Sequence, residues 1–235
     1  MTMATRAGSI AIAAVALGIG LSACGSGTTS GEATTSPSAA AETSAAPSSS
    51  AAPTTSAQAA DSLTTIPDYI RQNNIVENPV KRGDPGAPTI DLPFPEGWED
   101  MGANTPEWAY GGIAFTADPA MAEKPPTVTA IVSKLTGNVD PAKILEYAPN
   151  ELRKMPGFEG PETGKSSKLS GFDATQIGGT YVKDGVTQLV AQKTVVIPGQ
   201  DALYVLQLNA EGTEEQAGPL MDATAQIDEQ TTITP

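Results

Sequence analysis

The fold is decided by residues 172–209, which read FDATQIGGTYVKDGVTQLVAQKTVVIPGQDALYVLQLN. Three stretches of this segment, residues 172–183, 186–197 and 202–209, are rich in β-branched, aromatic and other apolar residues, as is typical of strands. They are separated by Lys183-Asp184-Gly185 and by residues 198–201 (Pro-Gly-Gln-Asp). Short connections of this composition are typical of β-hairpins, because they supply the backbone conformations of tight turns. The segment therefore predicts an antiparallel meander.

A short helix and three strands are predicted before this meander. Thr65-Ile66-Pro67-Asp68 indicates a helix start, with Thr65 as the cap and a proline in the first turn. A turn at residues 83–86 separates residues 75–80 from a strand at residues 89–92. Residues 107–116 and 127–135 have the β-branched and aromatic character of two further strands.

Two more helical segments complete the pattern. Asp140-Pro141 predicts a helix to about Met155, which Pro149 should kink or split. A last helix is predicted from about Thr213 to Ile227, with Leu220, Thr224 and Ile227 on its inner face.

The order of these elements predicts the fold class. Helices alternate with groups of strands that connect through short hairpins, so the sheet should be antiparallel and covered by helices. We therefore predict one α+β domain at residues 61–235, an antiparallel β-sheet sandwiched by helices.

The N-terminal residues predict export and lipidation. Arg6 precedes an apolar run from residue 10 to 21, which has signal-peptide length and is too short for a permanent membrane span. Leu21-Ser22-Ala23-Cys24 then matches a lipoprotein cleavage box, so residues 1–23 are predicted to be a signal peptide and Cys24 the acylated residue. Acyl chains on Cys24, with no other transmembrane stretch, would anchor the chain to the outer face of the cell membrane.

The composition of residues 24–235, which follow the predicted signal peptide, indicates a tether and an acidic domain. Residues 24–60 begin with Cys24 and are otherwise almost wholly Ser, Thr, Ala, Gly and Pro, a composition that predicts a disordered tether. The net charge is −14, and removal of residues 1–23, which carry one arginine and no acid, makes it −15. Such a charge argues against nucleic acid as a partner.

The domain also carries a family resemblance. Its segments are residues 65–70, 83–93, 110–113, 133–137, 140–143, 191–198, 205–210 and 227–235. In this order and spacing, with the cleavage box and the Ser/Thr-rich tether, they resemble the mycobacterial LpqN/LpqT lipoprotein family. The resemblance implies the fold shared by the PsbP and Mog families, a helix-covered antiparallel sheet. It implies no catalytic residue.

The residue types present exclude most catalytic chemistry. The chain has no histidine, and its one cysteine is the residue predicted to be acylated, so histidine-based and thiol-based catalysis and histidine-ligated zinc are excluded. We predict no enzyme activity, no catalytic residue, no cofactor and no metal. The stretch Gly160-Pro161-Glu162-Thr163-Gly164-Lys165-Ser166 resembles a phosphate-binding loop, but it is one residue short between the glycines and follows no strand. It is interpreted as a surface turn.

The sparse aromatic residues are the candidate ligand contacts. Trp98, Trp108 and Tyr110 cluster near the start of the predicted sheet and could stack on a sugar or line an acyl groove. The alternative, which the sequence favours, is that they are core residues.

Three functions are compatible with these observations. The leading hypothesis is a non-catalytic accessory lipoprotein that binds an envelope glycolipid or a lipid-transport partner in the membrane. The alternative is a surface-exposed or released virulence factor that binds a host protein. The third, a glycosidase or esterase that uses carboxylates alone, ranks below both, because acids such as Glu96 and Glu99 fall in apparent loops.

Overall fold

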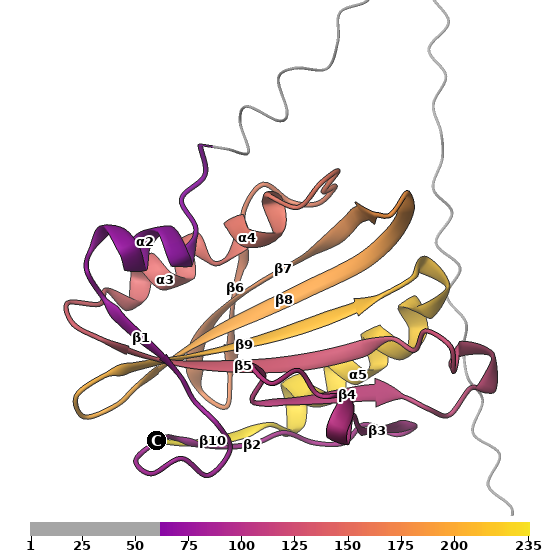
Figure 1. The fold of residues 1–235 in the computed structure, drawn as a ribbon, viewed down its shortest axis with the longest axis horizontal. Coiled ribbons are helices and arrows are strands. Elements are labelled where there is room, and N and C mark those ends of the chain that lie inside the picture. The colour runs from indigo at the N-terminus through magenta and orange to yellow at the C-terminus, as the bar shows by residue number, and fades with distance from the viewer. Residues whose placement is uncertain (1–61) are drawn as a thin grey trace, which may run out of the picture. The chain divides into compact units, whose positions relative to one another are not determined.

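The predicted meander forms the centre of the sheet. In the computed structural model, which describes residues 62–235, it consists of β7 (Phe172–Lys183), β8 (Val186–Pro198) and β9 (Leu203–Gly212). Both connections are antiparallel, with Gly178 opposite Ala191 and Ala191 opposite Ala210. The three strands lie side by side in Figure 1, and the prediction of an antiparallel meander is confirmed.

Other strands extend this sheet on both sides. Its strand order is β3-β4-β5-β9-β8-β7-β6, with β1 also paired to β5. The added strands are β1 (Val76–Pro79), β3 (Trp98–Asp100), β4 (Gly111–Phe115), β5 (Thr127–Thr136) and β6 (Lys165–Leu169). A separate two-stranded sheet joins β2 (Thr89–Asp91) to β10 (Thr232–Thr234). All recorded strand pairs are antiparallel among the described residues.

Helices cover both faces of the large sheet (Figure 1). One face carries α2 (Ile66–Gln72), α3 (Pro141–Tyr147) and α4 (Pro149–Arg153), and the other carries α5 (Ala217–Gln230). Short 3-10 turns lie at Gly102–Asn104, Pro119–Met121 and Glu214–Gln216. The predicted fold class, an antiparallel sheet between helices, is confirmed.

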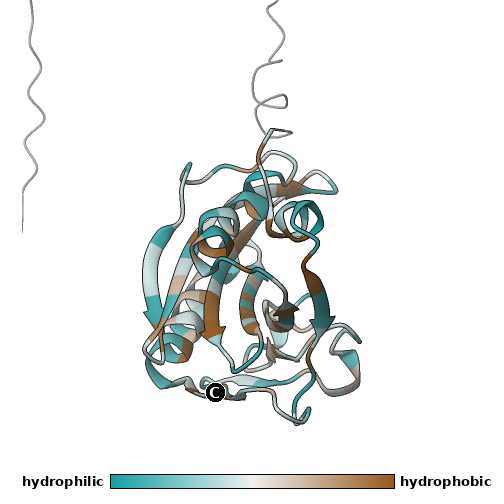
Figure 2. Cartoon of the chain, turned by 90° about the vertical axis from the view of Figure 1, so that its left-hand side faces the viewer, coloured by the Kyte–Doolittle hydropathy of each residue, from teal (hydrophilic) through white to brown (hydrophobic). Residues whose placement is uncertain are grey.

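Apolar side chains that alternate in direction along the strands form a separate core on each face of the sheet. In β9, Tyr204 and Leu206 belong to the core beneath α5, whereas Leu203 and Val205 belong to the core beneath α2 and α3. Successive side chains of a strand point to opposite faces, so one strand supplies both cores. Figure 2 shows this pattern as alternating hydrophobic and hydrophilic bands along the strands.

Several element boundaries differ from the predictions. The strand expected at residues 107–116 begins only at Gly111, because residues 107 and 108 form a turn. The last helix continues to Gln230, three residues beyond the expected Ile227. Its inner face contains the predicted Leu220, Thr224 and Ile227 and also the buried Ala223. The helix expected from Asp140 is divided at Pro149, as predicted. Strands β1, β3, β6 and β10 were not predicted.

The N-terminal predictions lie outside the described residues. These are the signal peptide at residues 1–23, acylation of Cys24 and the tether to residue 60. Within residues 62–235, no helix is both long enough and apolar enough to span a membrane.

Candidate ligand-binding cavity

Side chains fill only part of the space between α5 and the sheet. Strand register places Gly178, Ala191 and Ala210 in one row across β7, β8 and β9, all on the face that α5 covers. Such small side chains cannot reach a helix that packs at the ordinary distance from a sheet. A cavity of about 570 Å³ remains above this row.

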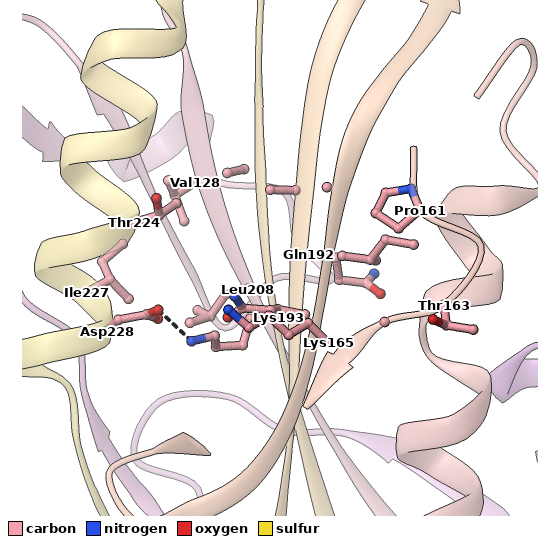
Figure 3. Close-up of a pocket in the computed structure, with 16 residues that line it drawn as sticks. Val128, Pro161, Thr163, Lys165, Gln192, Lys193, Leu208, Thr224, Ile227 and Asp228 are labelled. Atoms are coloured by element: carbon pink, nitrogen blue, oxygen red, sulfur yellow. Dashed lines mark ion pairs between the residues drawn. The ribbon is translucent and has the colours of Figure 1, made fainter. Parts of the chain in front are cut away.

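Helix α5 forms the opposite wall of this cavity. The 3-10 turn that leads into α5 begins with a capping box, in which the backbone N–H of Thr213 donates to Oε1 of Gln216 over 2.9 Å. Pro219 lies in the first turn, where its missing N–H costs nothing. The second half of the helix then presents Thr224, Ile227 and Asp228 to the cavity (Figure 3).

A second cavity continues the first toward the start of α5. It measures about 340 Å³ and shares Gly178, Ala191, Ala210 and Thr224 with the first. Beyond these residues its lining is largely apolar, with Leu189, Leu220 and Met221 among its members, and it also includes Glu159 and Thr180. The two cavities together form a groove along α5, and we call this the α5 groove.

The charged side chains of the larger cavity gather at one end of the α5 groove. Lys193 extends from β8, and its Nζ lies 2.6 Å from Oδ2 of Asp228 on α5 (Figure 3). Its side chain is 10% exposed, whereas that of Asp228 is 40% exposed. Gln176 lies opposite Lys193 on β7 and also lines the groove.

The stretch that resembles a phosphate-binding loop borders the same end. It leads into strand β6 instead of a helix, so its backbone amides are not aligned as a phosphate site requires. Pro161 and Thr163 line the cavity from the side opposite α5 (Figure 3). Gly164 packs so closely that an added Cβ would lie 2.4 Å from Oγ1 of Thr175.

The predicted aromatic contacts lie elsewhere. Trp98 and Tyr110 are buried in the core beneath α5, and the Trp98 ring packs 5.8 Å from the ring of Phe115. Trp108 is 56% exposed on the segment before β4. Among the described residues, the structure brings Trp98 and Tyr110 into one cluster, and none of the three lines the α5 groove.

The acidic residues considered for glycosidase chemistry are dispersed. Glu96 precedes β3, and Glu99 lies on that strand; both are exposed. Glu151, on α4, differs from these exposed acids. Its burial raises its pKa, and a hydrogen bond from Gln207 Nε2 opposes that shift. Across residues 62–235, no group of three or more acidic, histidine or cysteine side chains is placed to hold a metal ion.

Comparison with known proteins decides the family. The family model described as "Probable lipoprotein LpqN" matches residues 62–234. The chain belongs to the LpqN lipoprotein family. This membership confirms the resemblance found in the sequence and associates the chain with the cell envelope.

A curated sequence and a solved structure of LpqN support the fold and its extent. The chain is 54% identical to "Lipoprotein LpqN" of Mycobacterium tuberculosis over 178 residues, which are 76% of this chain and 77% of that protein. It also matches a crystal structure of LpqN "involved in cell envelope biogenesis of Mycobacterium tuberculosis", with a TM-score of 0.70 and 54% identity. That match covers 74% of this chain and 99% of the other. The more distant likeness to the PsbP and Mog families stays a prediction.

Proposed function

We propose that this protein is a non-catalytic accessory lipoprotein that binds an amphiphilic lipid of the cell envelope in the α5 groove. The lipid's apolar chain lies between α5 and the row formed by Gly178, Ala191 and Ala210. Cys24, once acylated, holds the domain at the outer face of the cell membrane, where such lipids occur.

The α5 groove is the observation that supports this proposal. Small-molecule sites are concave, mostly apolar and about 300–1,000 Å³ in volume. The larger part of the groove, at about 570 Å³, falls within this range. Its lining is mostly apolar, with a few polar groups at one end, which is the distribution that an amphiphile needs.

Family membership supports the location. The related LpqN of known structure is described as involved in cell envelope biogenesis, so a role in the same compartment is the natural proposal for this chain. An anchor at Cys24 and a flexible tether would restrict the domain to a shell next to the membrane. Such restriction raises its effective concentration for a membrane lipid or a lipid-transport partner.

The residue types support a binding role over catalysis. The chain lacks histidine, and the two acids that line the groove belong to different parts of it, Glu159 to the smaller cavity and the carboxylate of Asp228 to the larger one. That carboxylate is held by Lys193. A host protein as partner remains a hypothesis from the sequence, because no feature of residues 62–235 favours it.

A cavity-filling substitution tests the proposal. Ala191 lines both parts of the α5 groove, so Ala191→Leu would place a larger side chain in the space proposed for the acyl chain. Ala225→Leu is the matched control, because Ala225 is exposed on α5 and lines neither part. Both are made in the full chain with Cys24→Ser, so that no acyl chain of the protein competes for the groove.

The measurement is native mass spectrometry after incubation with mycobacterial envelope lipids. The chain with Ala225→Leu should carry bound lipid, and that with Ala191→Leu should be recovered empty. Equal lipid occupancy in the two variants, or an empty protein in both, would contradict the proposal. Retention of the wild-type chain in a membrane fraction, and its loss with Cys24→Ser, tests the anchor separately.

A further inference from the structure

Lys193 is a buried cation that is incompletely satisfied. It projects from the central strand β8, its residue is 8% exposed, and its one recorded partner among the described residues is Asp228. An ammonium group has three N–H donors, so a single carboxylate oxygen leaves two without an acceptor. A buried charge is stabilised only when its remaining donors also find partners.

The surroundings of Lys193 are more positive than the rest of the protein. Two lysines, Lys165 and Lys193, line the larger cavity with one acid, Asp228, although the whole chain has a net charge of −14. Next to Lys193, the floor has the apolar Leu208 opposite it on β9 and the polar Gln176 opposite it on β7, with Ala191 in the neighbouring row. Electrostatic attraction to a largely buried ammonium group is stronger than to one on an exposed surface.

The two parts of the α5 groove give it a direction. Lys193 and Asp228 lie at the end bordered by the C-terminal half of α5. From the shared row of Gly178, Ala191 and Ala210, the groove continues toward Leu220 and Met221 at the other half of the helix, away from Lys193. A polar end therefore leads into an apolar channel.

We propose that Lys193 binds the carboxylate of a single-chain fatty acid, whose hydrocarbon tail follows the row of small residues toward Leu220. The carboxylate oxygens accept the two free donors of the ammonium group, which keeps its ion pair with Asp228. This inference rests on the proposed function, because it names the ligand class of the same groove.

Lauric acid and lauryl alcohol are the probes that test this assignment. They have the same chain length and differ in the head group, and each is titrated against a neutral fluorescent lipid bound to the full chain with Cys24→Ser. Hydrogen bonds to charged groups contribute about 1.5–3 kcal/mol. The acid should therefore displace the fluorescent lipid at concentrations at least about ten-fold lower than the alcohol.

Lys193→Met removes the charge and retains most of the apolar stem. It should remove the preference for the acid, so that the acid and the alcohol displace the fluorescent lipid at similar concentrations. Lys168→Met is the matched control, because Lys168 also forms a 2.6 Å pair with an aspartate, Asp173, but is exposed on β6 outside the groove. Asp228→Asn keeps the lysine charge and should preserve or increase the preference, which provides a second variant if Lys193→Met does not fold.

The outcomes separate this inference from the proposed function. Equal binding of acid and alcohol by the wild-type chain, or an acid preference that survives Lys193→Met, would overturn the assignment to Lys193 and leave the lipid-binding proposal intact. Failure of both probes and of the fluorescent lipid to bind would overturn the proposed function as well.

Discussion

Truncation of Ile227 tests whether the α5 groove is an open space in solution. Ile227 is 3% exposed on α5, packs in the core beneath that helix and borders the larger cavity. Ile227→Ala removes three carbon groups, which are worth about 0.8 kcal/mol each when buried. Because the vacated volume joins an existing cavity, the additional cost of a newly enclosed void is small. The expected loss in the free energy of unfolding is therefore about 2–2.5 kcal/mol.

Ile144→Ala is the reference for this prediction. Ile144 is fully buried on α3, in the core of the opposite sheet face, and lines none of the recorded cavities among the described residues. The same truncation there leaves a closed void whose walls lose contacts. We expect about 4 kcal/mol, in the upper part of the range for isoleucine-to-alanine changes.

Urea unfolding of the two variants and the wild type measures this difference. The free energies come from linear extrapolation, and a shared slope with denaturant shows that the exposed area has not changed. If Ile227→Ala lowers the free energy of unfolding as much as Ile144→Ala does, the region around Ile227 is packed as tightly as the core on the opposite sheet face. The reasoning that leads to the α5 groove would then be wrong.

Three further predictions concern the other sheet face. Thr65→Ala should lower stability by about 1 kcal/mol in thermal unfolding, because Oγ1 of Thr65 accepts the backbone N–H of Asp68 at the start of α2. Hydrogen bonds from Thr65 lower the pKa of Asp68 from 3.8 to about 2, with smaller contributions from Lys154 and Arg71. The stability supplied by Asp68 is therefore present above pH 3.8 and lost as the pH falls toward 2, and Asp68→Asn should reduce this acid-dependent loss. Burial raises the pKa of Glu151, so Glu151→Gln should increase stability at pH 7 relative to the wild type. This gain should disappear below pH 4.5, where the wild-type carboxyl is protonated in both the folded and unfolded states; a gain unchanged by pH would contradict this explanation.

The elements that the sequence predicts well are those whose ends are marked by their own residues. Asp184 and Gly185 adopt positive φ values of 52° and 76°, the conformation that a tight hairpin needs. These two residues therefore predict the β7–β8 turn from the sequence alone. Pro149 divides α3 from α4, since it has no N–H to continue the helix.

The elements that were not predicted depend on a partner. Strand β6 reads Lys-Ser-Ser-Lys-Leu and has little strand propensity, but it pairs along its whole length with β7. Strand β10 is a three-residue segment that exists because β2 lies beside it. Local propensity cannot reveal such strands, because tertiary pairing determines them.

The α5 groove was not predicted for the same reason. The aromatic residues Trp98, Trp108 and Tyr110 were the predicted ligand contacts. The cavity instead arises because three strand positions carry no large side chain. A glycine pair at 178 and 179, inside a stretch that otherwise predicts a strand, was the signal present in the sequence. Its meaning depends on register, which aligns Gly178 with Ala191 and Ala210. A shift of one residue in either pairing would turn a small residue away from α5 and bring a neighbour such as Val190 toward it. The groove is therefore a property of register and of these three small residues, so a chain that retains both hairpin lengths together with Gly178, Ala191 and Ala210 should retain the cavity even where its surface residues change.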